Sequence, residues 1–459
     1  MVGELVIHLG DCKTGTTSIQ AALAKRLWRA EGQDIAYNVP FNHIPLAKSL
    51  TEGGLERIRR CQREALGLGN SDAPFGVISA EHFEFVDPLR LREAIDEFFP
   101  QYRSHLRLVA YVRPHIDRIL STYAERTKKG EIDLDIDEFA RVVIRRGRFV
   151  YHQRFAKWRA LFGTRFTLRP FIRSEMADGD VVADFFTYLF RGAPFSLPAD
   201  QTQNQSLSVE DLVMMRHIQR QMTARGGIDD AQRAFGWNFS EILGAAPQPE
   251  DSKGTRLRMH RRLAEKLIEH YRQDAEIIDR DHFSDRDRPM TRALEGSLSA
   301  AVAKPMSTEP TDYHDPAALR LMDCWGDFMI RMATADQRAY LKMASSPEYR
   351  VEPVTGPLVA GPGAEGRPAD LAAMSMSDTP ERETSERDTP RAALPAPALS
   401  ESVASGSATR APAVSAPVAS PLGGGPSLAR RSRVMITTGA LTLRGIARRM
   451  LSRLRQSRG

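Results

Sequence analysis

The stretch Leu5–Gln20, read as LVIHLGDCKTGTTSIQ, constrains the fold of this chain more than any other. Its apolar run Leu5–Leu9 suits a buried strand, and the polar run that begins at Thr16 opens a helix that we expect to end near residue 27. Between them, Gly10 and Gly15 allow the backbone to approach an anion closely, because they carry no Cβ. A strand that leads through such a loop into a helix predicts a phosphate-binding loop.

The anion site predicted at this loop combines backbone and side-chain donors. Free amide N–H groups at the helix start and the positive end of the helix dipole both attract an anion. Lys13 adds a full positive charge, and hydroxyl donors come from Thr14, Thr16, Thr17 and Ser18. The familiar nucleotide loop, G-x-x-x-x-G-K-[ST], places its lysine after the second glycine, whereas Lys13 precedes Gly15. The loop therefore has the same types of residue as a nucleotide loop, but the order of its lysine and its second glycine is reversed.

Further apolar runs alternate with helical patterns along the first 290 residues. Strands are predicted at 35–39, 75–79, 106–112 and 165–171, and helices at 55–66, 88–99, 135–146, 149–162 and 256–281. This alternation indicates an α/β fold with a parallel sheet. Ligands of such sheets bind at the carboxyl ends of the strands, so the residues that follow each strand are the candidates for a site.

A second motif follows the strand 106–112, in YVRPHIDRILSTY. Arg113 stands at the strand end, and Pro114 suits the first turn of a helix on which Arg118 and Ser121 share a face. Arg113 and Ser121 are placed to hold a second phosphate, for which the arginine fork is well suited. The alternative is an ordinary surface helix with solvated arginines.

The two motifs together resemble those of sulfotransferases that use PAPS (3′-phosphoadenosine 5′-phosphosulfate). KTGTTS is similar to their 5′-phosphosulfate loop, and an arginine followed eight residues later by a serine is similar to their 3′-phosphate motif. The resemblance to bacterial carbohydrate sulfotransferases extends to about Phe283. It implies a P-loop-like three-layer fold, with Lys13, Thr14, Gly15, Thr16, Thr17 and Ser18 at the 5′ end of PAPS and Arg113 and Ser121 at its 3′-phosphate.

The implied activity is in-line transfer of a sulfuryl group from PAPS to a hydroxyl of a carbohydrate or glycolipid acceptor, without a metal, leaving PAP as product. Lys13 is then expected to neutralise the leaving oxygen, and a base is needed to take the acceptor proton. Glu81 is the first candidate for that base and His82 the second, since both follow the strand 75–79. His8, inside the first strand, is more simply a packed core residue.

Two other classes of function remain as alternatives. An ATP-dependent P-loop kinase or NTPase would use the stretch 77–81 as the acidic strand that supports magnesium, but the displaced lysine argues against it. A scaffold with a vestigial nucleotide site is the third class, and the intact motif residues argue against that. The resemblance does not name the acceptor.

Composition adds limits on compartment and partners. The three cysteines, Cys12, Cys61 and Cys324, are odd in number and far apart, which favours neither a disulfide framework nor a metal site. With no secretion signal and no run of about 18 apolar residues, we expect a cytoplasmic protein. The net charge of +6 reflects the last thirty residues, which carry nine arginines and no acid. It therefore gives no reason to expect a nucleic-acid partner for the rest.

Domain boundaries follow from changes in pattern. We expect a sulfotransferase domain at 1–290 and a helical appendage or linker at 291–350, with Leu319, Met322, Trp325 and Met329 on its docking face. The Pro/Ala/Ser-rich stretch 351–429 should be disordered. The segment 430–459 reads as a basic amphipathic tail, which suits an anionic membrane surface, an acidic partner or a merely solvated end.

Overall fold

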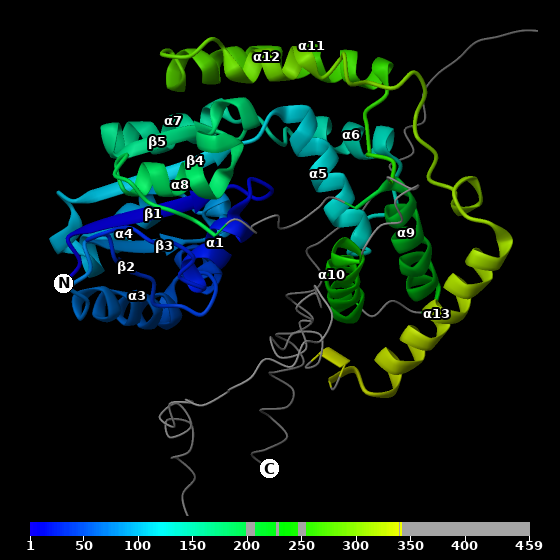
Figure 1. The fold of residues 1–459 in the computed structure, drawn as a ribbon, viewed down its shortest axis with the longest axis horizontal. Coiled ribbons are helices and arrows are strands. Elements are labelled where there is room, and N and C mark those ends of the chain that lie inside the picture. Colours follow the sequence, from blue (N-terminus) through cyan, green and yellow to red (C-terminus); the bar gives the residue numbers. More distant parts are fainter. Residues whose placement is uncertain (199–206, 226–228, 247–253, 339, 342–459) are drawn as a thin grey trace, which may run out of the picture. The chain divides into compact units, whose positions relative to one another are not determined.

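A five-stranded parallel sheet forms the centre of the chain (Figure 1). The computed structural model describes residues 1–198, 207–225, 229–246, 254–338 and 340–341. The strands are β1 (Glu4–Gly10), β2 (Ile35–Ala36), β3 (Phe75–Ser79), β4 (Leu106–Val112) and β5 (Phe166–Pro170), in the order β2-β3-β1-β4-β5. The predicted α/β class and parallel sheet are confirmed.

Helices cover both faces of the sheet and make three layers (Figure 1). Successive β1 side chains point to opposite faces, so Val6 packs with α1 (Thr16–Ala24) and α8 (Val181–Leu189), whereas Leu5 and Ile7 belong to the larger core on the other side. That larger core receives side chains from α2 (Ile44–Glu52), α3 (Gly54–Gly69), α4 (Pro88–Phe98), α5 (His115–Lys128), α6 (Ile136–Arg145), α7 (His152–Phe162), α11 (Arg261–His282) and α12 (Pro289–Gly296).

Several predicted boundaries were wrong. The helix expected from residue 256 begins at Arg261. The strand expected at 35–39 is a short edge strand of two residues, β2. The helix expected from 149 begins at His152, because Phe149 adopts a left-handed backbone (φ 63°) and the carboxylate of Asp274 accepts the amide N–H groups of Tyr151 and His152. The start of α7 is thus set by a contact with the distant helix α11. The local sequence pattern contains no sign of that contact.

A third apolar cluster joins α9 (Val209–Ala224), α10 (Asp229–Ala245) and α13 (Pro316–Ala335). Ser208 caps α9, since its hydroxyl accepts the amide of Asp211 at 3.1 Å. On the docking face predicted for α13, Met329 packs against this cluster and Leu319 and Met322 are partly buried. Trp325 is the exception at 44% exposed, and the buried contacts come from Ile330 and Ala333. Asp323, hydrogen-bonded to His217 of α9 at 2.7 Å, helps to set this rotation of the helix.

Packing continues past the predicted boundary at residue 290. Met290 and Leu294 of α12 are buried in the larger core, and Asp279 of α11 accepts the amides of Met290 and Thr291. The described residues, up to 341, belong to one compact unit. The predictions for 351–429 and 430–459 lie outside the described residues. No helix in the described part is long and apolar enough to cross a bilayer.

Candidate functional site

The loop between β1 and α1, residues 11–15, is called the phosphate loop below because the sequence predicts that it binds phosphate. It lies at the carboxyl edge of the sheet. β1 has β3 on one side and β4 on the other, so the connections after β1 and β4 leave this edge toward different parts of the sheet. Such switch points are where parallel sheets bind ligands. Lys13 follows β1 and Arg113 follows β4. The topology alone therefore brings the two predicted motifs to one place.

The loop has the backbone of an anion site. Lys13 and Gly15 both have left-handed φ angles, 68° and 74°, a conformation that helps to turn neighbouring amides toward one side. Gly15 is the N-cap of α1, so no side chain caps this helix, and its first turn holds no acid. A side-chain cap is present on α6, α8, α9 and α13 and is absent from α2, α3, α5, α7 and α12 as it is from α1. The amides and positive dipole end of α1 are thus left for another anion.

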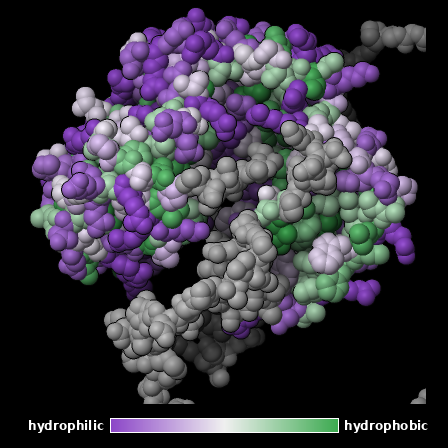
Figure 2. Space-filling model, in the orientation of Figure 1, coloured by the Kyte–Doolittle hydropathy of each residue, from purple (hydrophilic) through white to green (hydrophobic). Residues whose placement is uncertain are grey.

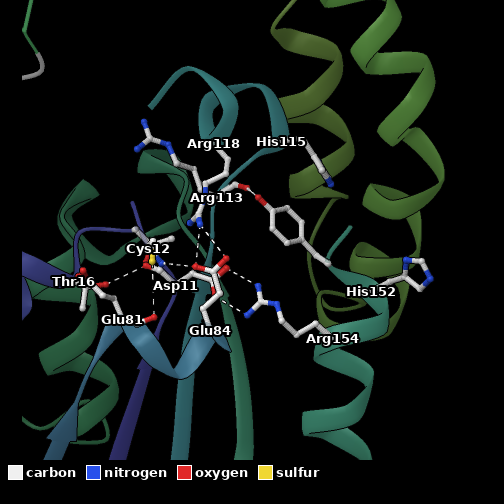
Figure 3. Close-up of polar contacts among 12 residues, drawn as sticks. Asp11, Cys12, Thr16, Glu81, Glu84, Arg113, His115, Arg118, His152 and Arg154 are labelled. Carbon is white, nitrogen blue, oxygen red and sulfur yellow. Dashed lines mark hydrogen bonds and ion pairs between the residues drawn. The ribbon is translucent and has the colours of Figure 1, made fainter. Parts of the chain in front are cut away.

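Two buried acid–arginine pairs hold the start of this loop (Figure 3). Asp11, 1% exposed, accepts two hydrogen bonds of 2.6 Å from Arg154 of α7. Glu84 accepts from Arg118 of α5 at 3.1 and 3.0 Å and from the amide of Cys12 at 3.0 Å. The backbone carbonyl of Asp11 accepts from the hydroxyls of Thr14 and Thr16 at 2.7 and 3.2 Å. Helices α5 and α7 thereby fix the loop from outside.

Burial sets the protonation of these groups. It raises the pKa of Asp11, which Arg154 opposes and the nearby Glu84 reinforces. The pKa of Glu84 is lowered instead, because Arg118 and Arg154 outweigh its burial. Burial and Glu84 raise the pKa of the Cys12 thiol far above its usual range. A raised pKa favours the thiol form of Cys12, which is a weak nucleophile.

Arg113 joins the second motif to the first. Its Nη1 donates to the carbonyl oxygen of Lys13 at 3.0 Å, and its guanidinium lies 5.4 Å from the ring centre of Phe171. Burial and the like charges of Arg118 and Arg256 lower the pKa of Arg113. Because Arg118 is paired with Glu84, the cation that this motif offers to a phosphate is Arg113 itself. Ser121 lies two turns further along α5, partly exposed, and in the described part of the chain its hydroxyl has no hydrogen bond to the loop.

Lys13 shares its carboxylate partner with two other lysines. Glu125 of α5 accepts from Lys13 at 3.1 Å, Lys128 at 2.9 Å and Lys129 at 2.6 Å. Burial raises the pKa of Glu125, but the three ammonium groups outweigh it and hold the pKa well below its usual range. Burial lowers the pKa of Lys13, which Glu125 opposes. This group of four residues is called the lysine cluster below.

Both candidate bases adjoin the loop, in different surroundings. A Cβ at Gly10 would lie 2.5 Å from the Cα of Glu81, so a glycine is required for Glu81 to pack against the end of β1. Burial raises the pKa of Glu81, and Lys13 and Lys129 oppose that rise. Burial, together with Lys48 and Lys129, lowers the pKa of His82. A carboxylate with a raised pKa beside the reacting group suits a general base.

The remaining predicted residues lie along the first turn of α1. Thr17 is exposed and Ser18 partly exposed, and the amide of Ser18 donates to the carbonyl of Gly15 at 3.0 Å. His8 is fully buried, hydrogen-bonded to Ser79 at 2.9 Å, and burial lowers its pKa to about 3. It is a packed core residue, as predicted.

Sequence reasoning missed the residues that support the loop. Asp11 and Glu84 each lie close in sequence to a predicted site residue. A buried carboxylate beside a phosphate loop needs an arginine partner. The position of these two acids is therefore the one signal in the sequence that could have pointed to the supporting arginines. Arg154 and Asp274 come from distant helices and carry no local pattern. Arg118 lies on the helix that the second motif predicts, but it binds Glu84.

No family model, no curated protein and no solved structure matches this chain. Among the described residues, no group of three or more histidine, cysteine, aspartate or glutamate side chains is arranged to hold a metal ion.

Proposed function

We propose that this chain is a sulfotransferase that moves a sulfuryl group from PAPS to a hydroxyl of a carbohydrate or glycoconjugate. The observation that carries the proposal is the hydrogen bond of 3.0 Å from Arg113 to the carbonyl of Lys13. It joins two cationic motifs that follow neighbouring strands at a switch point. PAPS carries charge at both ends of an adenosine, so a protein that uses it needs two anion sites at one edge.

The proposed donor site uses the loop and α5. The 5′-phosphosulfate is held at the uncapped start of α1 by Lys13, Thr14, Gly15, Thr16, Thr17 and Ser18. Thr14 and Thr16 contribute backbone amides there, because their hydroxyls donate to the carbonyl of Asp11. Arg113 and Ser121 hold the 3′-phosphate. Since the anion site needs room at the helix start, the lack of a side-chain cap on α1 is consistent with this assignment.

In the proposed reaction the acceptor oxygen attacks sulfur while the bond from sulfur to the 5′-phosphate oxygen breaks. The acceptor proton passes to Glu81, and Lys13 neutralises the charge that develops on the leaving oxygen. Burial raises the pKa of Glu81 and so its basicity, and the nearby Lys13 opposes that rise. PAP and a sulfate ester are the products.

Ligand-dependent stability tests the donor site. PAP should raise the melting temperature more than ATP with magnesium at equal concentration, because only PAP carries the 3′-phosphate. At about 100 times the dissociation constant the stabilisation is about 2.7 kcal/mol. Radiolabelled PAPS, incubated with the protein and fractionated glycans, should then label an acceptor. A larger shift with ATP and magnesium would favour a kinase or NTPase.

A further inference from the structure

The lysine cluster holds three ammonium groups and one carboxylate, and with the nearby carboxylate of Glu81 counted it still keeps one excess positive charge. Three ammonium groups contact the single carboxylate of Glu125. The side chains of Glu125, Lys128 and Lys129 are 18%, 18% and 26% exposed, so the cluster is partly buried and weakly screened. Each ammonium has three N–H donors. Lys13 is assigned to the donor in the proposed function, whereas Lys128 and Lys129 have no part in it.

The fold holds Lys128 and Lys129 firmly at the end of α5. The carbonyl of Lys128 accepts from Gln219 of α9 at 2.8 Å. A Cβ at Gly236 would collide with that same carbonyl, so a glycine is required for α10 to approach this close. The approach places the ring of Trp237 5.7 Å from the ammonium of Lys129, with Trp237 43% exposed. Helices α9 and α10, which lie outside the sheet, thus shape the surface around Lys128 and Lys129. Figure 2 shows that polar and apolar side chains mix on the face of the molecule that it draws.

This surface adjoins Lys13, because Lys13 and Lys129 both contact the carboxylate of Glu125, at 3.1 and 2.6 Å. Lys129 also acts electrostatically on Glu81 and His82, the two candidate bases. An acceptor hydroxyl that reaches a sulfuryl group beside Lys13 therefore has its neighbouring substituents within reach of Lys129. Cations beside an exposed indole suit a sugar ring that carries an anionic group.

We infer that the acceptor is an acidic saccharide, whose carboxylate or sulfate group is bound by Lys128 and Lys129 beside the indole of Trp237. This inference rests on the proposed function and adds the acceptor class to it. The ligand neutralises the excess charge of the lysine cluster, and the C-terminal end of α5 holds the two lysines in place. A neutral saccharide leaves that charge unbalanced and binds more weakly.

Calorimetry on the full chain saturated with PAP tests the inference. The probes are a glucuronate-containing disaccharide, the same disaccharide with its carboxyl reduced to an alcohol, and that reduced disaccharide carrying a sulfate ester. Both acidic probes should bind about tenfold or more tighter than the reduced one. Preference for one acid identifies which anion the site takes, and equal binding of all three overturns the inference.

Variants assign the preference to the lysines. Lys129→Gln should remove most of the tenfold preference, and Lys129→Arg should keep most of it, because the charge stays. Arg126→Gln is the matched control, since Arg126 lies on the same turn but binds Glu131. If Lys129→Gln weakens the acidic and reduced probes equally, the inference fails. If it weakens PAP equally, the lysines belong to the donor site and the inference also fails. Absence of PAP binding to the unsubstituted chain would refute the proposed function instead.

Discussion

The pair of Asp11 and Arg154 gives the sharpest test of how the loop is held. Arg154→Met keeps most of the side-chain volume and removes the charge. Asp11 is 1% exposed and makes both of its arginine bonds at 2.6 Å, so the change leaves a buried carboxylate without its partner. Breaking a buried pair in this way costs about 3 to 5 kcal/mol. We expect a loss of stability in that range at pH 8.

The cost should depend on pH. Burial already raises the pKa of Asp11 to about 6, and removal of Arg154 raises that pKa further. The variant can therefore neutralise Asp11 by taking up a proton as the pH falls. We expect the stability difference from the unsubstituted chain to be smaller at pH 5.5 than at pH 8, because the protonated acid no longer needs a cation.

Urea unfolding followed by circular dichroism, at both pH values, measures this. Asp11→Asn with Arg154→Met completes a double-mutant cycle, and the double variant should be more stable than Arg154→Met alone. Arg159→Met, on an exposed face of the same helix, is the control for a lost arginine. If Arg154→Met lowers the free energy of unfolding by less than about 1 kcal/mol, the pair behaves like a solvated surface pair. That result would refute the idea that Asp11 and Arg154 hold the loop.

Three other changes test separate parts of the site. Arg113→Ala should weaken PAP by about 10- to 100-fold but leave adenosine 5′-phosphosulfate nearly unchanged, measured by calorimetry; equal losses would remove Arg113 from the 3′ site. Glu81→Gln should keep PAP affinity and lower turnover of labelled PAPS by about 100-fold or more, and if His82→Ala does so instead, the base is His82. Burial of His8 lowers its pKa from 6.5 to about 3, so the unfolded chain binds the extra proton between these values; stability should be complete above pH 6.5 and fall toward pH 3, by on the order of 5 kcal/mol, and His8→Gln should flatten that slope in urea titrations.

The sequence was enough to predict the sheet and the residues at its edge. Apolar runs such as Phe75–Ser79 and Leu106–Val112 are strands because both faces of a parallel sheet are covered, and their ends follow from where the run stops. Lys13, Glu81 and Arg113 then meet at one edge by topology, without any further information. Residues that directly follow buried strands can thus be identified from the amino-acid pattern alone.

Helix faces and helix starts were less predictable, because distant contacts decide them. The spacing of Leu319, Met322 and Met329 predicted the side of α13 that packs, but Trp325 in the same pattern is exposed. The contacts of Asp323 and Asp327 with His217 and Arg225 help to set this rotation of the helix. Periodicity identifies a helix and its apolar side, but it does not fix the rotation of the helix against its neighbours.

The support of the loop runs through helices that are far apart in the sequence. Asp274 of α11 accepts from His115 of α5 at 2.8 Å and from the amides at the start of α7. That start carries Tyr151, whose hydroxyl donates to the carbonyl of Arg113, and one turn later Arg154, which holds Asp11. One carboxylate on α11 therefore positions both cations that flank the phosphate loop. The loop has its own sequence signature, but its orientation depends on residues that no local motif contains.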